Sequence, residues 1–114
     1  MEQNCIFCQI ANGKSPAEVE YEDSEVMGFW DIHPQAPVHI VIIPKKHIST
    51  IANITEADFN VLGRMFLAAN EIAQKKNLSD SGYRLIINYG RNAGLVVEHL
   101  HMHLIGGKNL GGLA

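Results

Sequence analysis

The run VVEHLHMHLI at residues 96–105 decides the fold of this chain. It holds three of the chain's six histidines, at alternate positions. Side chains in a β-strand alternate between two faces, so a strand over residues 96–105 presents all three imidazoles on one face. Its other face carries Leu100, Met102 and Leu104, which can pack against a helix. Gly106 and Gly107 end the predicted strand.

The three imidazoles of His99, His101 and His103 suggest a chemical site. Their crowding disfavours protonating all three together, so at least one is expected to be neutral near pH 7. A neutral imidazole can bind a metal ion or act as a nucleophile. The alternative is a set of half-buried sheet histidines, or a remnant of metal binding. The strict alternation opposite an apolar stripe favours a functional site.

Outside this run, hydrophobic periodicity predicts one long helix over residues 56–76. Thr55 supplies an N-cap hydroxyl, and acidic residues fill the first turn. Apolar residues at spacings of three and four predict its buried face. These residues are Phe59, Leu62, Phe66, Ala69 and Ala73.

The remaining expected elements are a short helical turn and four further strands. The turn covers residues 5–11, and the strands cover residues 18–21, 26–31, 39–43 and 83–88, with a proline-interrupted loop at residues 32–37. Strands that gather before one long helix are typical of an α+β fold. We therefore expect a mostly antiparallel sheet of about five strands with one long helix and a short N-terminal helix. We expect a single domain over residues 1–114.

Composition excludes several classes of protein. Apolar residues make up 46% of the chain and charged residues 18%, with a net charge of −3, which is typical of a globular domain. The absence of a basic cluster argues against binding to long nucleic acid. No window is apolar enough for a membrane span, and the first residues lack the features of a secretory signal. These features predict a cytoplasmic protein without a membrane partner.

Several motifs together resemble the histidine-triad family, most closely its Hint branch of nucleotide-binding phosphoramidases. The first half of the pattern is DIHPQAPVH at residues 31–39 and IPKKHI at residues 43–48. The second half is YRLIIN at residues 83–88 and VEHLHMHLIGG at residues 97–107. The tail LGGLA at residues 110–114 also resembles bacterial members of this branch.

The resemblance implies a division of labour among polar residues. His101 is implied as the nucleophile, which takes the nucleotidyl group before water releases a nucleoside monophosphate. His103 is implied to donate a hydrogen bond to the phosphate, with His39 behind the triad. Asp31 would hold the ribose hydroxyls, and Asn88 would contact phosphate or ribose. Asp31 could instead cap the following turn, and Asn88 could be a turn former.

The resemblance also implies an apolar slot for a purine base, and phosphate contacts from the main chain. The slot would consist of Ile6, Phe7, Ile10, Phe29, Ile32 and Val41. The main-chain N–H groups of Val96 and Val97 could bind phosphate oxygens. The resemblance also implies His99 as a catalytic residue, beside His101, His103 and His39. Phe29, Ile32 and Val41 could alternatively be ordinary core residues.

Cys5 and Cys8 form a C-X-X-C pair, which in a cytosolic chain indicates a metal clamp or a redox pair rather than a structural disulfide. Some relatives of the family, including galactose-1-phosphate uridylyltransferases, bind zinc through such a pair and two histidines. That resemblance implies His47 and His99 as the other two ligands of a structural Zn²⁺. A metal-free pair of small apolar residues and a redox pair remain alternatives.

The segment GLVVE at residues 94–98 departs from the family pattern, because Leu95 and Val96 replace a glutamine and a polar residue. Loss of one donor to a transition state costs on the order of a hundredfold in rate. The sequence therefore predicts a slower enzyme or a shifted leaving-group preference.

The leading functional hypothesis is a purine nucleoside phosphoramidase or a related nucleotidyl hydrolase. The alternatives are a nucleotide-binding or interaction protein with weak catalysis, and a hydrolase of dinucleoside polyphosphates. The resemblance also implies a homodimer.

Overall fold

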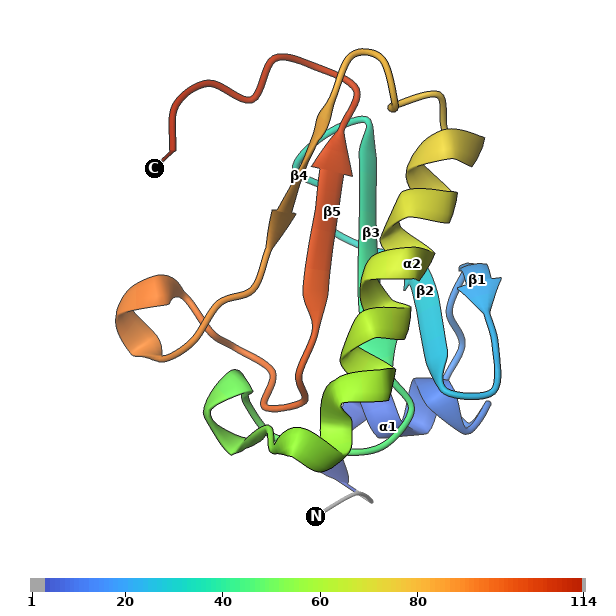
Figure 1. Ribbon diagram of the computed structural model, residues 1–114, viewed down its shortest axis with the longest axis vertical. Coiled ribbons are helices and arrows are strands. Elements are labelled where there is room, and N and C mark those ends of the chain that lie inside the picture. The colour runs from blue at the N-terminus through green and yellow to red at the C-terminus, as the bar shows by residue number, and fades with distance from the viewer. Residues whose placement is uncertain (1–3, 114) are drawn as a thin grey trace.

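The structure, a computed structural model, describes residues 4–113, which form one antiparallel sheet with two helices (Figure 1). The strand order is β1-β2-β3-β5-β4, and all neighbouring strands are antiparallel, which confirms the expected fold class. The strands are β1 (Val19–Glu22), β2 (Val26–Trp30), β3 (Val38–Pro44), β4 (Tyr83–Ile86) and β5 (Met102–Gly106).

The helices are α1 (Ile6–Ala11) and α2 (Phe59–Lys75), and a 3-10 turn at Glu56–Asp58 precedes α2. The predicted N-cap is confirmed: the Thr55 hydroxyl accepts from the Ala57 N–H at 3.3 Å, while the Asp58 carboxylate accepts from the Thr55 N–H at 2.9 Å. Further 3-10 turns lie at Ile51–Asn53 and Arg91–Ala93. Among residues 4–113, no helix is long and apolar enough to cross a membrane.

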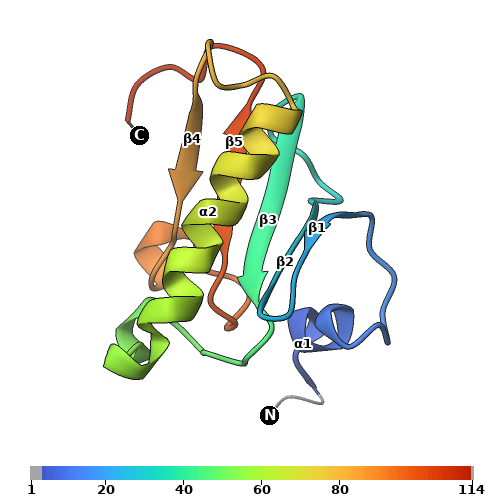
Figure 2. The same ribbon diagram turned by 45° about the vertical axis from the view of Figure 1, so that its right-hand side comes forward.

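The two faces of the sheet carry separate apolar clusters. Helix α2 covers one face, and α1 lies on the opposite side near one end of the strands (Figure 2). Leu100, Met102 and Leu104 pack in the cluster under α2, as the alternation predicts. The smaller cluster joins Phe29 and Val41 to α1. The histidines of this segment therefore lie on the α1 side.

The last strand is shorter than predicted, because residues 96–101 are not in a strand and β5 begins at Met102. The β3–β5 ladder ends where Ile42 pairs with Met102. Beyond it, Pro44 has no N–H to extend the ladder, and the Leu100 N–H donates to the Ile48 carbonyl at 2.6 Å instead. His99 and His101 therefore lie in an irregular segment that leads into β5, with a bend at His99. The strand predicted at residues 83–88 likewise ends at Ile86.

The buried face of α2 matches the predicted face only in part: Ala69 and Ala73 are buried as predicted, and Leu62 packs against the core. Phe59 and Phe66, expected in the core, are 65% and 54% exposed, while Met65 is 1% exposed. The buried residues are Val61, Met65, Ala68, Ala69, Ile72 and Ala73. Apolar residues with spacings of three and four form two neighbouring stripes along this helix. The sheet packs against the stripe that contains Met65 and Ile72. An exposed apolar row, which includes Phe59, Phe66 and Leu67, remains on the surface.

Truncation of Met65 tests this assignment of the core. Met65→Ala should lower the free energy of unfolding by about 2–5 kcal/mol, because a buried side chain leaves a cavity. Asn70→Ala, on the exposed side of the same helix, should change it by no more than about 0.5 kcal/mol. Urea unfolding followed by circular dichroism measures both. An equal loss in the two variants would contradict the assignment.

Candidate active site

A row of side chains across three strands forms the base of the candidate site. Phe29 of β2 pairs with Val41 of β3, and Val41 pairs with His103 of β5. In antiparallel strands, directly opposed residues lie on the same face. His39, two positions before Val41, therefore lies diagonally beside His103. This register brings two histidines and two apolar side chains to the α1 side of the sheet.

The imidazole of His101 is held in one orientation by the main chain. Its Nδ1 lies 2.7 Å from the carbonyl oxygen of His99, which can only accept, so Nδ1 carries the proton. In the neutral ring, Nε2 then keeps its lone pair. Phe7 of α1 packs edge-on against the same ring, with centroids 5.1 Å apart. His101 is thus a buried imidazole with an oriented lone pair at Nε2.

His39 and His103 form a second oriented pair. The Gln35 N–H donates to His39 Nδ1 at 3.0 Å, so the proton of the neutral His39 ring is on Nε2. That Nε2 lies 2.9 Å from His103 Nδ1, which therefore accepts. The proton of the neutral His103 ring is consequently on Nε2. His103 thus presents an N–H donor at the edge of its ring that is not bonded to His39.

Burial keeps both rings of this pair neutral. Burial lowers the pKa of His39, and the neighbouring Asp31 carboxylate opposes the shift. The pKa of His103 falls to about 4, first because of burial and then because of the positive charges that His101 and His39 can carry. The donor role of His103 therefore persists through neutral pH.

Asp31 follows β2 and faces the same pair. Its Oδ2 lies 3.4 Å from His39 Nε2, and its Oδ1 accepts from the His33 N–H at 2.8 Å. The second contact closes the turn after the strand, as the capping interpretation of the sequence predicts. The ribose contact implied for Asp31 stays a prediction.

A separate cluster of sulfur and nitrogen atoms joins α1 to the segment before β5. Cys8 Sγ lies 3.2 Å from His47 Nδ1 and 3.4 Å from His99 Nδ1, and Cys5 Sγ lies 3.2 Å from His99 Nδ1. The four ligand atoms all lie within 4.8 Å of one another. The sequence places these residues far apart, and the fold gathers all four as predicted. We call this group the Cys/His cluster.

The hydrogen bonds around each group decide which could hold a metal ion. In the Cys/His cluster, His99 Nε2 donates to the Pro44 carbonyl at 2.8 Å, which leaves the Nδ1 lone pair facing the sulfurs. Asp31, His39 and His103 also lie close together. There, however, His39 Nδ1 already accepts from Gln35, so its Nε2 carries a proton where a metal would bind. The hydrogen bonds therefore favour the first of these two groups over the second as a holder of zinc.

The predicted apolar slot is brought together only in part. Phe29 and Val41 are buried, and Phe7 and Ile10 of α1 pack against them. Phe7 and Phe29 meet edge-on, with centroids 5.5 Å apart. Ile6 is partly exposed at the start of α1, and Ile32 is 86% exposed in the loop after β2. Neither Ile6 nor Ile32 belongs to the buried apolar cluster.

The loop between β4 and β5 carries the other predicted nucleotide contacts. The Asn88 side-chain amide donates to the Ala93 carbonyl at 2.7 Å and so braces the loop, as the turn-former interpretation predicts. Val96 is 88% exposed and Val97 is half-buried. Their contacts with phosphate stay predictions.

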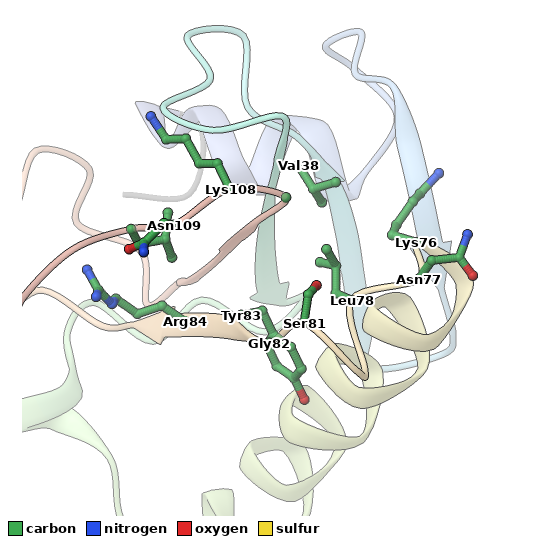
Figure 3. Close-up of a pocket in the computed structure, with 12 residues that line it drawn as sticks. Val38, Lys76, Asn77, Leu78, Ser81, Gly82, Tyr83, Arg84, Lys108 and Asn109 are labelled. Carbon is green, nitrogen blue, oxygen red and sulfur yellow. The ribbon is translucent and has the colours of Figure 1, made fainter.

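A hollow lies away from these histidines, beside the C-terminal end of α2 (Figure 3). Its volume is 780 Å³, and Lys76, Arg84 and Lys108 contribute cationic side chains to its wall. Arg84 donates to the Gly111 carbonyl at 3.0 Å and tethers the tail after β5. None of the residues predicted for the site lines this hollow.

Two functional groups of the site escape sequence analysis, because both belong to the main chain. The Gln35 N–H sets the proton on His39, and the Pro44 carbonyl sets the proton on His99. Every residue except proline has such an N–H, and every residue has the carbonyl. Their identity depends on loop geometry, so no residue-type signal marks them.

Comparisons with known proteins agree on one family. The family described as "Scavenger mRNA decapping enzyme C-term binding" matches residues 4–112. The chain is similar to the purine nucleoside phosphoramidase of Escherichia coli K12, with 42% identity over 97% of this chain and 93% of that protein. It is also similar to protein HitA of Neisseria gonorrhoeae, with 44% identity over 90% of this chain and 95% of that protein.

Solved structures give the same result. A HIT family hydrolase from Legionella pneumophila has a TM-score of 0.93 and 45% identity, covering 95% of this chain and 96% of that chain. A HIT family hydrolase from Clostridium thermocellum has a TM-score of 0.94 and 43% identity, covering 97% of this chain and 96% of that chain.

The lowered pKa of His103 predicts a pH-dependent contribution to stability. The unfolded chain takes up a proton at this position as pH falls through the ordinary value of 6.5, whereas the folded protein resists until about 4. Stability from this group is therefore complete above that window and is lost as pH falls through it. Unfolding of wild type and His103→Gln between pH 7.5 and 5 should show a steeper loss in wild type. Parallel pH profiles would contradict the assignment.

Proposed function

Because this chain belongs to the histidine-triad (HIT) family, we propose that it hydrolyses nucleoside 5′-phosphoramidates or related nucleotidyl compounds to a purine nucleoside monophosphate. The observation that supports this most is the orientation of His101. Its Nδ1 is bonded to the His99 carbonyl, so its Nε2 lone pair is available to a phosphorus atom. The phosphoramidase named among the relatives agrees with this substrate class.

The proposed reaction has two displacements at phosphorus. His101 Nε2 forms a bond to phosphorus while the bond to the leaving amine breaks, and the amine departs with that electron pair and takes a proton from water. Water then attacks phosphorus and gives a proton to the hydroxide left by the first step, the bond to Nε2 breaks with its electron pair returning to His101, and the nucleoside monophosphate leaves. The intermediate divides one difficult displacement into two easier ones. The His99 carbonyl stabilises the positive charge that develops on His101.

The remaining groups bind and orient the substrate in this proposal. The His103 Nε2–H donates to a phosphate oxygen, and the His39 contact of 2.9 Å holds that ring in place. The Asp31 carboxylate accepts hydrogen bonds from the ribose hydroxyls. The purine lies against the apolar side chains of Phe7 and Ile10 on α1 and of Phe29 and Val41 on the sheet. Asn88 keeps the loop that carries Val96 and Val97 in place.

The exposed Val96 favours a second candidate, a nucleotide-binding protein with weak catalysis. Val96 is 88% exposed and, with Leu95, replaces side chains that could assist a leaving group. A main-chain N–H can still bind phosphate, so binding does not depend on these side chains. Turnover separates this candidate from the leading one.

We also propose that the Cys/His cluster binds a structural Zn²⁺ through Cys5, Cys8, His47 and His99. Two sulfurs and two imidazoles form a usual tetrahedral donor set, with bonds of about 2.3 Å to sulfur and 2.0–2.1 Å to nitrogen. The sulfur–nitrogen separations of 3.2–3.4 Å suit such a set. When bound, zinc would cross-link α1 to the segment that carries the triad. It has no part in the displacement itself.

We also propose that the chain forms a homodimer. β4 is at one end of the strand order, and α2 carries the exposed apolar row that includes Phe59, Phe66 and Leu67. Sheet edges and apolar patches of this kind are common sites of association. Sedimentation equilibrium would give the assembly state. The cytoplasmic location stays a prediction.

Replacing His101 tests the proposed mechanism. His101→Ala should lower the hydrolysis of adenosine 5′-phosphoramidate on the order of a thousandfold or more, because the attacking lone pair is lost. Acid-quenched wild type should carry a nucleoside monophosphate on the peptide that contains residue 101, as measured by mass spectrometry. His33→Ala is the matched control, since His33 is exposed and lies outside both histidine groups.

Each outcome of this experiment has a distinct meaning. Full activity in His101→Ala would refute the nucleophile. Normal binding of a nucleoside monophosphate by wild type without turnover would favour the binding protein instead.

Metal analysis tests the zinc proposal. Purified wild type should contain zinc equimolar with the chain, and Cys8→Ser should lose most of it and melt at a lower temperature, because one ligand and its cross-link are gone. His103→Gln should keep its zinc, since His103 is not among the four proposed ligands. Inductively coupled plasma mass spectrometry gives the metal content. A metal-free wild type would exclude the site.

A further inference from the structure

The two sulfurs of the Cys/His cluster lie at the start of one short helix. Cys5 is the N-cap of α1, and the Cys8 N–H donates to Cys5 Sγ at 3.3 Å. Both sulfurs face the same atom, His99 Nδ1, and they lie within 4.8 Å of each other. Side-chain rotation within one helical turn can close such a gap to a disulfide bond of about 2.05 Å. Cys5 and Cys8 therefore have the placement of a dithiol pair.

The two cysteines differ in their accessibility to solvent. A hollow of 390 Å³ lies beside α1, and Cys5, His47 and Glu98 are among the residues that line it. Cys8 does not line this hollow. The exposed fraction is 9% for Cys5 and 4% for Cys8. A small oxidant thus reaches Cys5 first, while Cys8 is the buried partner behind it.

We infer that Cys5 and Cys8 are a reversible thiol–disulfide modification site, with Cys5 as the residue that a peroxide oxidises first and Cys8 as the resolving residue. Cys5 sulfur attacks one peroxide oxygen, the O–O bond breaks, and Cys5 sulfenic acid and one water form. Cys8 sulfur then attacks Cys5 sulfur and displaces a second water. The two thiols together lose two electrons and two protons, and hydrogen peroxide takes them up. A dithiol reductant reverses the bond.

The modification acts on the residues that orient the proposed nucleophile. Cys5 and Cys8 contact the His99 imidazole, and the His99 carbonyl accepts the hydrogen bond from His101. Phe7, between the two cysteines, packs against the rings of both His99 and His101. A disulfide sulfur can neither donate to an imidazole nor act as a thiolate ligand. Oxidation therefore removes the thiol contacts of Cys5 and Cys8 with the His99 imidazole and loosens the attachment of α1 to the triad segment.

This consequence for catalysis rests on the proposed function, and the release of metal rests on the proposed zinc site. The disulfide itself rests only on the positions of Cys5 and Cys8. The readouts below are therefore masses and metal content, and they do not depend on hydrolysis. If the chain is not a hydrolase, the proposed modification site still stands. If the disulfide does not form, the proposed hydrolase activity still stands.

The test treats the purified full-length chain with hydrogen peroxide. Non-reducing peptide mass analysis should show the α1 peptide lighter by two hydrogens, with recovery of the original mass after dithiothreitol. A chromogenic chelator should record zinc released in step with this change. Hydrogen exchange should become faster in α1 and remain unchanged in β2.

Single variants test the order of attack. Cys8→Ser should stop at a sulfenic acid on Cys5, which dimedone traps. Cys5→Ser should label at Cys8 at least roughly tenfold more slowly, because reaction follows access to the thiol. Circular dichroism establishes that both variants are folded. If either variant does not fold, the mass of the wild-type α1 peptide alone decides whether the disulfide forms.

Three results would overturn the inference. One is an unchanged α1 peptide after peroxide treatment that oxidises exposed methionines. Another is a disulfide between chains instead of within one. The third is direct oxidation of either cysteine to sulfinic acid without a disulfide stage.

Discussion

The pairing of β3 with β5 places almost every group of the site. Its register sets Val41 of β3 opposite His103 of β5. The same face of the sheet also carries His39 on β3 and Phe29 on β2. The pairing stops at Met102, so the two histidines before it can leave the ladder and turn toward α1. A shift of β5 by one residue would send the His103 side chain to the α2 side, away from Val41 and His39. The site therefore depends on the register of this pair of strands.

Main-chain groups then give each imidazole a definite role. The His99 carbonyl fixes the proton of His101, and the Gln35 N–H fixes that of His39. The same side chain thus presents a lone pair at Nε2 of His101, an N–H at Nε2 of His103 and a lone pair at Nδ1 of His99. Burial reinforces this order, because it keeps the pKa of His103 near 4 and its ring neutral. The differences among the rings come from their surroundings.

Much of this arrangement follows from local patterns in the sequence. The alternation of His99, Leu100, His101 and Met102 predicts opposite faces. Leu100 and Met102 do pack under α2, and the two histidines contact Phe7 of α1, although residues 99–101 lie outside the ladder. The Thr55 cap is equally local. The stripe on α2 is different: Met65 and Phe66 both belong to helical apolar patterns, and only packing against the sheet selects Met65. The hydrogen bonds of Gln35 and Pro44 likewise arise from loop geometry, which residue types do not encode.

The Gln35 contact also bears on how such a protein tolerates metal ions in a cell. A chain with six histidines and two cysteines offers soft donors to any transition-metal ion, and the group around His39 combines two imidazoles with a carboxylate. An ion bound there would need the His39 Nε2 that faces His103 and Asp31. Because a main-chain N–H occupies the far side of the His39 ring, the near nitrogen keeps its proton and rejects the cation. One main-chain amide thereby distinguishes this group from the Cys/His cluster, where the His99 Nδ1 lone pair faces the sulfurs.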